Sequence, residues 1–213
     1  MNNLFTNDFE VNGNVLRLLA LSNERPGFDF DVLNKIVGEE FSALGGFIKE
    51  NAQILFIRDN VDLSIEGTYP AGHTYFPTEA MIAVPSWRNL DLNELRAVIA
   101  HELHHMARWQ NVGYGTTLGG AIASEGIATF YEEIRSGRKP KWAESVVSVE
   151  ALAEAKKEWN SQSYNHQEWF YDGPYGRWIG YSLGYELAKK YFAQFDIEAS
   201  ISLDAKELHE QIV

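Results

Sequence analysis

The segment from Asp91 to Gln110 constrains the fold of this 213-residue chain more than any other part of the sequence. Its apolar residues recur at spacings of three and four, which predicts an amphipathic helix of about five turns. These residues are Leu92, Leu95, Val98, Ile99, Leu103 and Met106. Asp91 followed by Glu94 has the spacing of a capping box, so the helix is predicted to begin there.

Residues 101–105 of this helix read His-Glu-Leu-His-His, an HExxH pattern. Residues i and i+4 share one face of a helix, so the imidazoles of His101 and His105 can converge on one Zn²⁺ at roughly 2.0–2.1 Å. Glu102 lies one position round the helix, where a general base can take a proton from metal-activated water. We interpret His104 as a surface residue or as a support for a ligand.

A zinc ion held by two histidines and a water still needs one protein ligand. The segment Thr116–Gly137 predicts a second helix, with a threonine at its start and a glycine just past its end. Glu125 lies in the middle of this helix among apolar residues, and a carboxylate in such a stretch is expected to be paired or to bind a metal. It follows His105 by 20 residues, which is similar to the HExxH…Glu spacing of thermolysin-like metallopeptidases.

Two other zinc-site classes are excluded by the residues present. The metzincin pattern requires a glycine and a histidine three and six residues past the second histidine, where this chain has Arg108 and Asn111. A deformylase-type site requires a cysteine ligand, and the chain has no cysteine. Glu125 is therefore the remaining candidate for the third ligand.

The formal net charge of −12 argues against nucleic acid as a partner, because nucleic-acid binding needs a basic surface. No run approaches 18 apolar residues and the first residues have no signal-peptide pattern, so we expect a cytoplasmic protein without a membrane partner. We expect a single domain over residues 1–213, and a division into two lobes, about 1–110 and about 111–213, stays open. The oligomeric state also stays open.

The rest of the chain predicts further helices and two strands. Helices are expected at 14–22, ended by Arg25-Pro26-Gly27, and at 29–49, 145–161, 175–194 and 202–213. Strands are expected at 53–57 and 79–84, loops with at most short strands at 61–78, and a loop at 164–174. In thermolysin-like enzymes an edge strand borders the cleft, and an extended peptide adds to it through main-chain hydrogen bonds. We expect residues 79–84 to be that strand, with substrate beside Ile82, Ala83 and Val84.

Three motifs together carry a family resemblance: His-Glu-Leu-His-His at 101–105, Ser-Glu-Gly-Ile-Ala at 124–128 and Gly-Tyr-Ser-Leu-Gly-Tyr at 180–185. Over roughly residues 50–213 the chain resembles the DUF2268 family of predicted Zn-dependent proteases. The resemblance implies an α+β, gluzincin-like fold: a small N-terminal strand region, then a mainly helical, thermolysin-like metallopeptidase domain with an active-site helix and a glutamate helix. It also implies Zn²⁺ bound by His101, His105 and Glu125.

The predicted function is zinc-dependent hydrolysis of peptide bonds in a peptide or protein substrate, with Glu102 as general base. The oxyanion of the tetrahedral intermediate needs a donor besides zinc. We favour Tyr181, which lies in the third motif, and leave three alternatives open: Tyr175, His166 and Arg177. The alternative function is a catalytically silent, metal-binding regulatory or interaction protein on a gluzincin scaffold.

Overall fold

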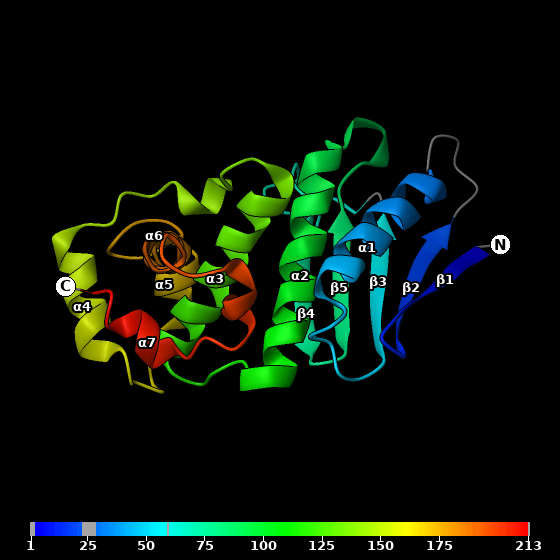
Figure 1. Ribbon diagram of the computed structural model, residues 1–213. Coiled ribbons are helices and arrows are strands. Elements are labelled where there is room, and N and C mark those ends of the chain that lie inside the picture. Colours follow the sequence, from blue (N-terminus) through cyan, green and yellow to red (C-terminus); the bar gives the residue numbers. More distant parts are fainter. Residues whose placement is uncertain (1–2, 23–28, 59, 213) are drawn as a thin grey trace. The chain divides into compact units, whose positions relative to one another are not determined.

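A computed structural model describes residues 3–22, 29–58 and 60–212 of the chain (Figure 1). These residues form an α+β protein with a five-stranded sheet and seven α-helices in the described part, which confirms the predicted class. They fall into two compact units, 1–110 and 111–213. The break predicted at Arg25-Pro26-Gly27 lies outside the described residues.

The sheet belongs to the first unit and has the strand order β1-β2-β3-β5-β4. β2, β3 and β5 run parallel to one another, whereas β1 is antiparallel to β2 and β4 is antiparallel to β5. The strands are β1 Asn3–Val11, β2 Asn14–Ser22, β3 Ala52–Arg58, β4 Ala71–Phe76 and β5 Glu79–Val84. β1 and β4 are therefore the two outer strands of the sheet.

The helix predicted at 14–22 is wrong, because this segment is strand β2 and pairs with β1 in a hairpin. Asn12 and Gly13 make the turn, both with positive φ, at 54° and 82°. Two positive φ values define the type I′ turn that best matches the twist of a hairpin, and Asn-Gly is its preferred sequence. Leu16 and Leu18 alternate with partly exposed residues, so β2 buries only one face.

The edge strand predicted at Glu79–Val84 is also wrong, because β5 lies between β3 and β4 and is paired along both edges. Ile82, Ala83 and Val84 are 0–1% exposed. A peptide cannot add to this strand through main-chain hydrogen bonds, since its ladder positions are taken. The outer strand on this side is β4, which was expected to be part of a loop. Its register with β5 shifts between Thr74 and Phe76.

Two helices of the first unit, α1 Phe30–Leu44 and α2 Leu92–Val112, lie side by side in front of the sheet (Figure 1). Asp29 caps α1, because its carboxylate accepts hydrogen bonds from the amides of Asp31 and Val32. Arg96 joins the two helices through ion pairs with Glu39, at 2.5 Å, and with Glu40. The larger buried apolar residues of both helices are Leu33, Ile36, Val37, Phe41, Leu44, Leu95, Val98, Ile99, Leu103 and Met106.

The second unit is helical. Its α-helices are α3 Leu118–Ser136, α4 Val149–Glu158, α5 His166–Phe170, α6 Ile179–Phe192 and α7 Ala205–His209. α3 begins at the Thr117 cap and ends at Gly137, whose φ of 74° closes the helix in the left-handed region. The loop predicted at 164–174 contains α5, and the helices predicted at 145–161 and from 202 onward are shorter than expected.

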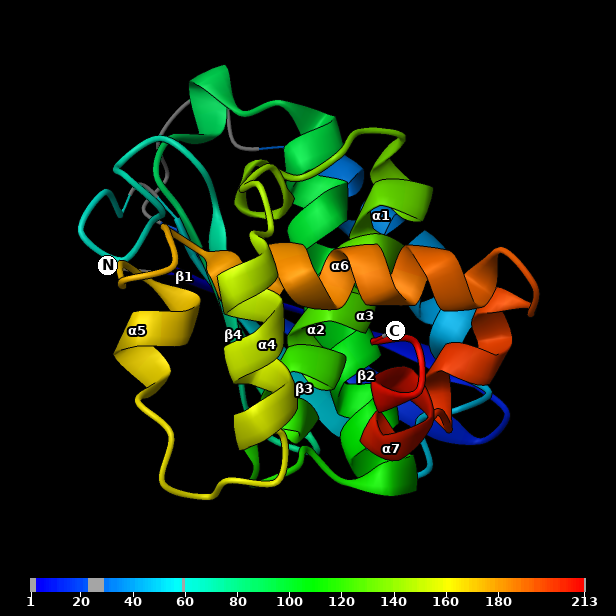
Figure 2. The same cartoon turned by 90° about the vertical axis from the view of Figure 1, so that its left-hand side faces the viewer.

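The helices α3 and α6 pack closely enough that their backbones touch. α6 is seen nearly end-on in Figure 1 and lengthwise in Figure 2, where it crosses α3. A Cβ added at Gly126 would meet the backbone of Gly184, and one added at Gly184 would meet the carbonyl oxygen of Ile122. Gly184 is the α6 residue that permits this contact, whereas a Cβ at Gly180 would meet the ring of Phe170.

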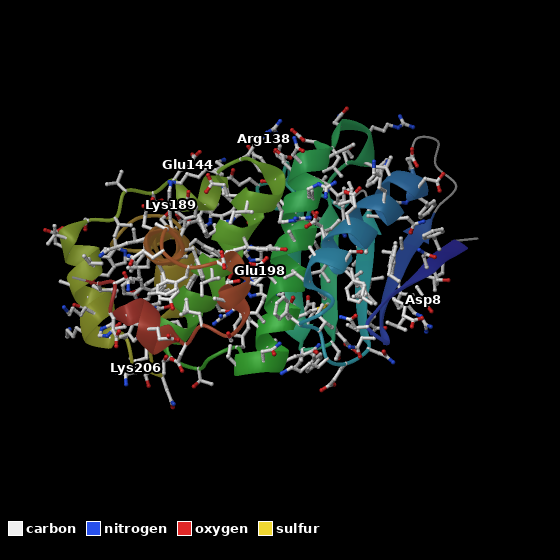
Figure 3. All side chains as sticks on the ribbon, viewed as in Figure 1. Asp8, Arg138, Glu144, Lys189, Glu198 and Lys206 are labelled. Atoms are coloured by element: carbon white, nitrogen blue, oxygen red, sulfur yellow. The ribbon has the colours of Figure 1, made fainter. Side chains whose placement is uncertain are left out.

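Most of the charged side chains are at least partly exposed, as the labelled Asp8 and Lys206 illustrate (Figure 3). On β1 and β2, Arg17 donates two hydrogen bonds of 2.8 Å to the carboxylate of Asp8, and this bonding holds the pKa of Asp8 below its ordinary value. No helix among the described residues has the length and apolar content that crossing a membrane requires.

Candidate metal centre

The two histidines of the HExxH pattern lie on one face of α2. The carboxylate of Asp91 accepts a hydrogen bond of 2.8 Å from the amide of Asn93, so the helix starts where its sequence predicts. His101 and His105 are 8% and 3% exposed, and their Nε2 atoms lie 3.0 Å apart. Their rings meet at 78° with centroids 4.6 Å apart, so the two imidazoles approach each other through their Nε2 atoms.

This pair fits a zinc ion. Two nitrogens bound to one tetrahedral zinc at about 2.0–2.1 Å lie about 3.3 Å apart. The observed separation of the Nε2 atoms of His101 and His105 is 3.0 Å, so a shift of a few tenths of an ångström would give the metal-bound geometry. Both atoms already converge without a rotamer change, which is the arrangement expected of a preformed ligand pair.

Glu102 is 3% exposed and its carboxylate lies against strand β4. The hydroxyl of Thr74 donates a hydrogen bond of 2.7 Å to Oε2 of Glu102 and lies 3.2 Å from its main-chain oxygen. Gly72 lies beneath the same side chain, so closely that a Cβ at position 72 would collide with the carboxylate. The carboxylate of Glu102 is therefore held in one place by a neighbouring strand.

Glu125 lies in the middle of α3 and is 7% exposed. The hydroxyl of Tyr114 donates a hydrogen bond of 2.5 Å to its Oε1. Tyr114 stands between two glycines with positive φ, Gly113 at 83° and Gly115 at 89°. These two glycines let the loop before α3 turn tightly enough to bring the phenol to the carboxylate. The burial of Glu125 is thus compensated by a directed hydrogen bond.

His101, His105 and Glu125 are a group of buried side chains that could hold a metal ion, and they are the residue types that zinc takes as ligands. If a metal were bound, the Glu125 carboxylate could supply an oxygen ligand beside the two imidazoles.

The neighbouring His104 is fully buried, which corrects the interpretation of this residue as a surface side chain. Burial lowers the pKa of His104 well below its ordinary value, and the positive charge of Arg108 adds to this effect. His104 is therefore neutral at physiological pH and is part of the buried face of α2.

The four side chains considered as oxyanion donors all belong to the second unit, where they pack among aromatic rings. Tyr181 lies edge-on to Phe170 at 5.3 Å between ring centroids. Tyr175 lies 5.4 Å from Trp169, His166 stacks on Phe170 at 4.6 Å, and Arg177 lies 4.0 Å above the ring of Trp178. Tyr181 is partly buried, whereas His166 and Arg177 are exposed.

Thr129, Glu132 and Glu133 follow Glu125 by one and two turns of α3. Thr129 and Glu132 are buried. Glu133 accepts a hydrogen bond of 2.5 Å from the hydroxyl of Tyr185, so it fastens α3 to α6. Burial and this bond together raise the pKa of Tyr185, which keeps the phenol protonated as a donor.

Sequence reasoning missed Thr74, Gly72 and Tyr114. Thr74 and Gly72 lie in a segment that was expected to be a loop, and no local pattern connects residue 74 with residue 102. Tyr114 did carry a signal, because an aromatic residue between two glycines directly before a buried helix indicates a shaped turn.

Comparisons with known proteins identify a family and a similar fold. A family model described as predicted Zn-dependent protease (DUF2268) matches residues 33–210. No curated protein matches the chain. The crystal structure of an aminopeptidase N family protein from Idiomarina loihiensis is similar, with a TM-score of 0.50 and 10% sequence identity. The likeness covers 99% of this chain but 40% of that chain, and at this identity it shows the fold alone.

Proposed function

Because the chain belongs to the DUF2268 family of predicted Zn-dependent proteases, we propose that it is a zinc metallopeptidase that hydrolyses peptide bonds. The observation that carries this proposal is the buried pair of Nε2 atoms, 3.0 Å apart, with the Glu102 carboxylate one position round the helix. A purely structural metal site needs no base beside it, so the intact Glu102 favours a catalytic site.

The ligands in this proposal are His101, His105 and Glu125, on a gluzincin-like scaffold. Each of the three is buried, and each has the chemistry that zinc prefers in catalytic sites, which have three protein ligands and an open fourth position. The hydrogen bond from Tyr114 would orient the Glu125 carboxylate toward the metal, as outer hydrogen bonds generally do for metal ligands.

When bound, zinc would supply Lewis-acid chemistry that acidifies water and polarises the scissile carbonyl. The Glu102 carboxylate accepts a proton from the water whose oxygen adds to the carbonyl carbon. It then delivers this proton to the amide nitrogen as the carbon–nitrogen bond breaks, so the products are a carboxylic acid, which keeps the second hydrogen of the water, and an amine. We propose Tyr181 as the donor to the oxyanion, since its phenol is a hydrogen-bond donor on the helix that carries the third motif.

We propose that an extended peptide binds along β4 rather than β5. β4 is an outer strand of the sheet, and in the described residues its only ladder partner is β5. Its other edge can therefore take main-chain hydrogen bonds from a substrate strand. The same strand contacts Glu102 through Thr74, so a peptide on this edge would lie near the base.

The test combines metal analysis with a cleavage assay. The purified protein is expected to contain one zinc per chain and to cleave members of a mixed peptide library, detected by mass spectrometry. Glu102→Gln should keep zinc and lose turnover, whereas His101→Ala and Glu125→Ala should lose zinc. Zinc content unchanged in Glu125→Ala would remove this residue from the ligand set. A wild-type protein that binds zinc but cleaves no peptide would favour the regulatory alternative.

A further inference from the structure

The outer strand β4 touches the carboxylate of Glu102 with two residues, Gly72 and Thr74. Residues i and i+2 of a strand point to the same face, so both are directed at α2. The residues between and after them, His73 and Tyr75, are exposed. The face of β4 that meets α2 therefore places a glycine, Gly72, and a hydroxyl residue, Thr74, against the side chain of Glu102.

Thr74 and Gly72 lie beside different oxygens of the Glu102 carboxylate, Oε2 and Oε1. The Thr74 hydroxyl, on a side chain that is 5% exposed, donates to Oε2 at 2.7 Å. Its other neighbour, the main-chain oxygen of Glu102, is farther away at 3.2 Å. A hydroxyl has one hydrogen, and the shorter distance assigns that hydrogen to the carboxylate. A hydrogen bond to a charged acceptor is stronger and more directional than one between neutral groups.

Gly72 contributes by the absence of a side chain. A Cβ at this position would lie within collision distance of Oε1, Cγ and Cδ of Glu102. Since Gly72 is not among the residues with positive φ, the requirement for glycine comes from space and not from backbone conformation. Any larger residue would push the Glu102 side chain out of its present position.

We propose that Thr74 is a positioning residue that fixes the carboxylate of Glu102, and that Gly72 provides the clearance for it. This inference rests on the proposed function in so far as Glu102 is the general base. A base placed within hydrogen-bonding reach of the attacking water must keep its orientation, because small misplacements of reacting groups cost large factors in rate. Thr74 restricts the rotation of Glu102 without adding a charge beside it.

The first test compares Thr74→Val, which replaces the hydroxyl by a methyl group of similar shape, with Thr74→Ser, which keeps the hydroxyl. Thr74→Val is expected to lower kcat roughly 10- to 100-fold with KM and zinc content unchanged, as supporting hydrogen bonds at metal sites typically do. Thr74→Ser should recover most of the lost kcat. Thr78→Val, in the turn after the same strand, is the matched control and should leave kcat unchanged.

The second test does not depend on activity. A double-mutant cycle with Thr74→Val and Glu102→Ala is measured by urea unfolding of the metal-free protein. If the two residues acted independently, the double variant would change the unfolding equilibrium constant by the product of the two single effects. We expect the observed change to be about tenfold smaller than this product, because the hydrogen bond between the two residues is lost only once. Gly72→Ala should lower kcat with zinc retained, since it displaces the same carboxylate.

Independent effects of the two substitutions in the cycle would overturn the assignment. A kcat of Thr74→Ser as low as that of Thr74→Val would also overturn it, because the methyl group of Thr74 and not its hydroxyl would then matter. A wild-type protein that cleaves no substrate would refute the proposed function. In that case the cycle still decides whether Thr74 holds Glu102.

Discussion

Replacing Gly126 by alanine should destabilise the second unit, because the added methyl group would meet the backbone of α6. The atoms nearest to the new Cβ are the carbonyl carbon, Cα and oxygen of Gly184. Since these are main-chain atoms, no change of rotamer can relieve the collision. The two helices would have to separate, and the buried residues between them would lose packing.

The expected size follows from two opposing effects. Overpacking a core typically costs about 1–3 kcal/mol, and a backbone obstacle places this substitution near the upper end. Alanine gains about 1 kcal/mol over glycine in helix propensity. The net loss is therefore about 2 kcal/mol. For a chain of this size, 1 kcal/mol corresponds to roughly 2–4 °C in Tm, so the Tm should fall by about 4–8 °C.

The assay is urea and thermal unfolding of Gly126→Ala beside a matched control, Gly38→Ala in α1. A Cβ at Gly38 lies 3.2 Å from a ring carbon of Phe9, a side chain that can turn away, so the control should stay within about 1 kcal/mol of the wild type. The double variant Gly126→Ala with Gly184→Ala should lose less stability than the sum of the two single losses, because one separation of α3 from α6 makes room for both methyl groups. A Gly126→Ala variant as stable as the wild type would refute the close contact of α3 and α6.

Three further outcomes are expected. Tyr114→Phe removes the donor to Glu125 and should weaken zinc binding about 10- to 100-fold in a chelator competition assay; an unchanged affinity would separate this phenol from the metal site. Tyr185→Phe leaves Glu133 without this hydrogen bond and should lower the free energy of unfolding by about 1–3 kcal/mol, measured with urea; a neutral effect would show that water replaces the phenol. Removing zinc should lower the Tm, since a ligand at 1,000 times its Kd stabilises by about 4 kcal/mol, whereas the Tm of His101→Ala should not respond to a chelator.

The elements that depend on local periodicity were predictable. The helix with the HExxH pattern was expected at 91–110 and is observed as α2 Leu92–Val112, because helical spacing of apolar residues is a property of the sequence itself. The segment Asn14–Ser22 was assigned wrongly, since its closely spaced leucines fit both a helix and a buried strand. The deciding signal was Asn12-Gly13 just before it, whose preference for a hairpin turn outweighs the ambiguity of the leucines.

The arrangement of strands was not predictable from local pattern. β5 was expected at an edge because it precedes the helix with the HExxH pattern. The strand order, however, also depends on β4, which precedes β5 in the chain and pairs antiparallel with it on its outer side. The contact that holds the Glu102 carboxylate could not be predicted from local pattern either. The HExxH spacing identifies Glu102, whereas its contact with Thr74 joins residues 28 positions apart and arises only when β4 packs on the helix.

Because β4 lies at the edge of the sheet, it has an unpaired outer edge among the described residues and a face that packs on α2. Its outer edge is available to an extended peptide, and its inward-facing hydroxyl at Thr74 holds the carboxylate of Glu102. A peptide that docks on this edge and straightens or shifts the strand would carry the hydroxyl with it. Under the proposed function, recognition of a substrate and alignment of Glu102 as the base would therefore be mechanically linked through one short length of backbone.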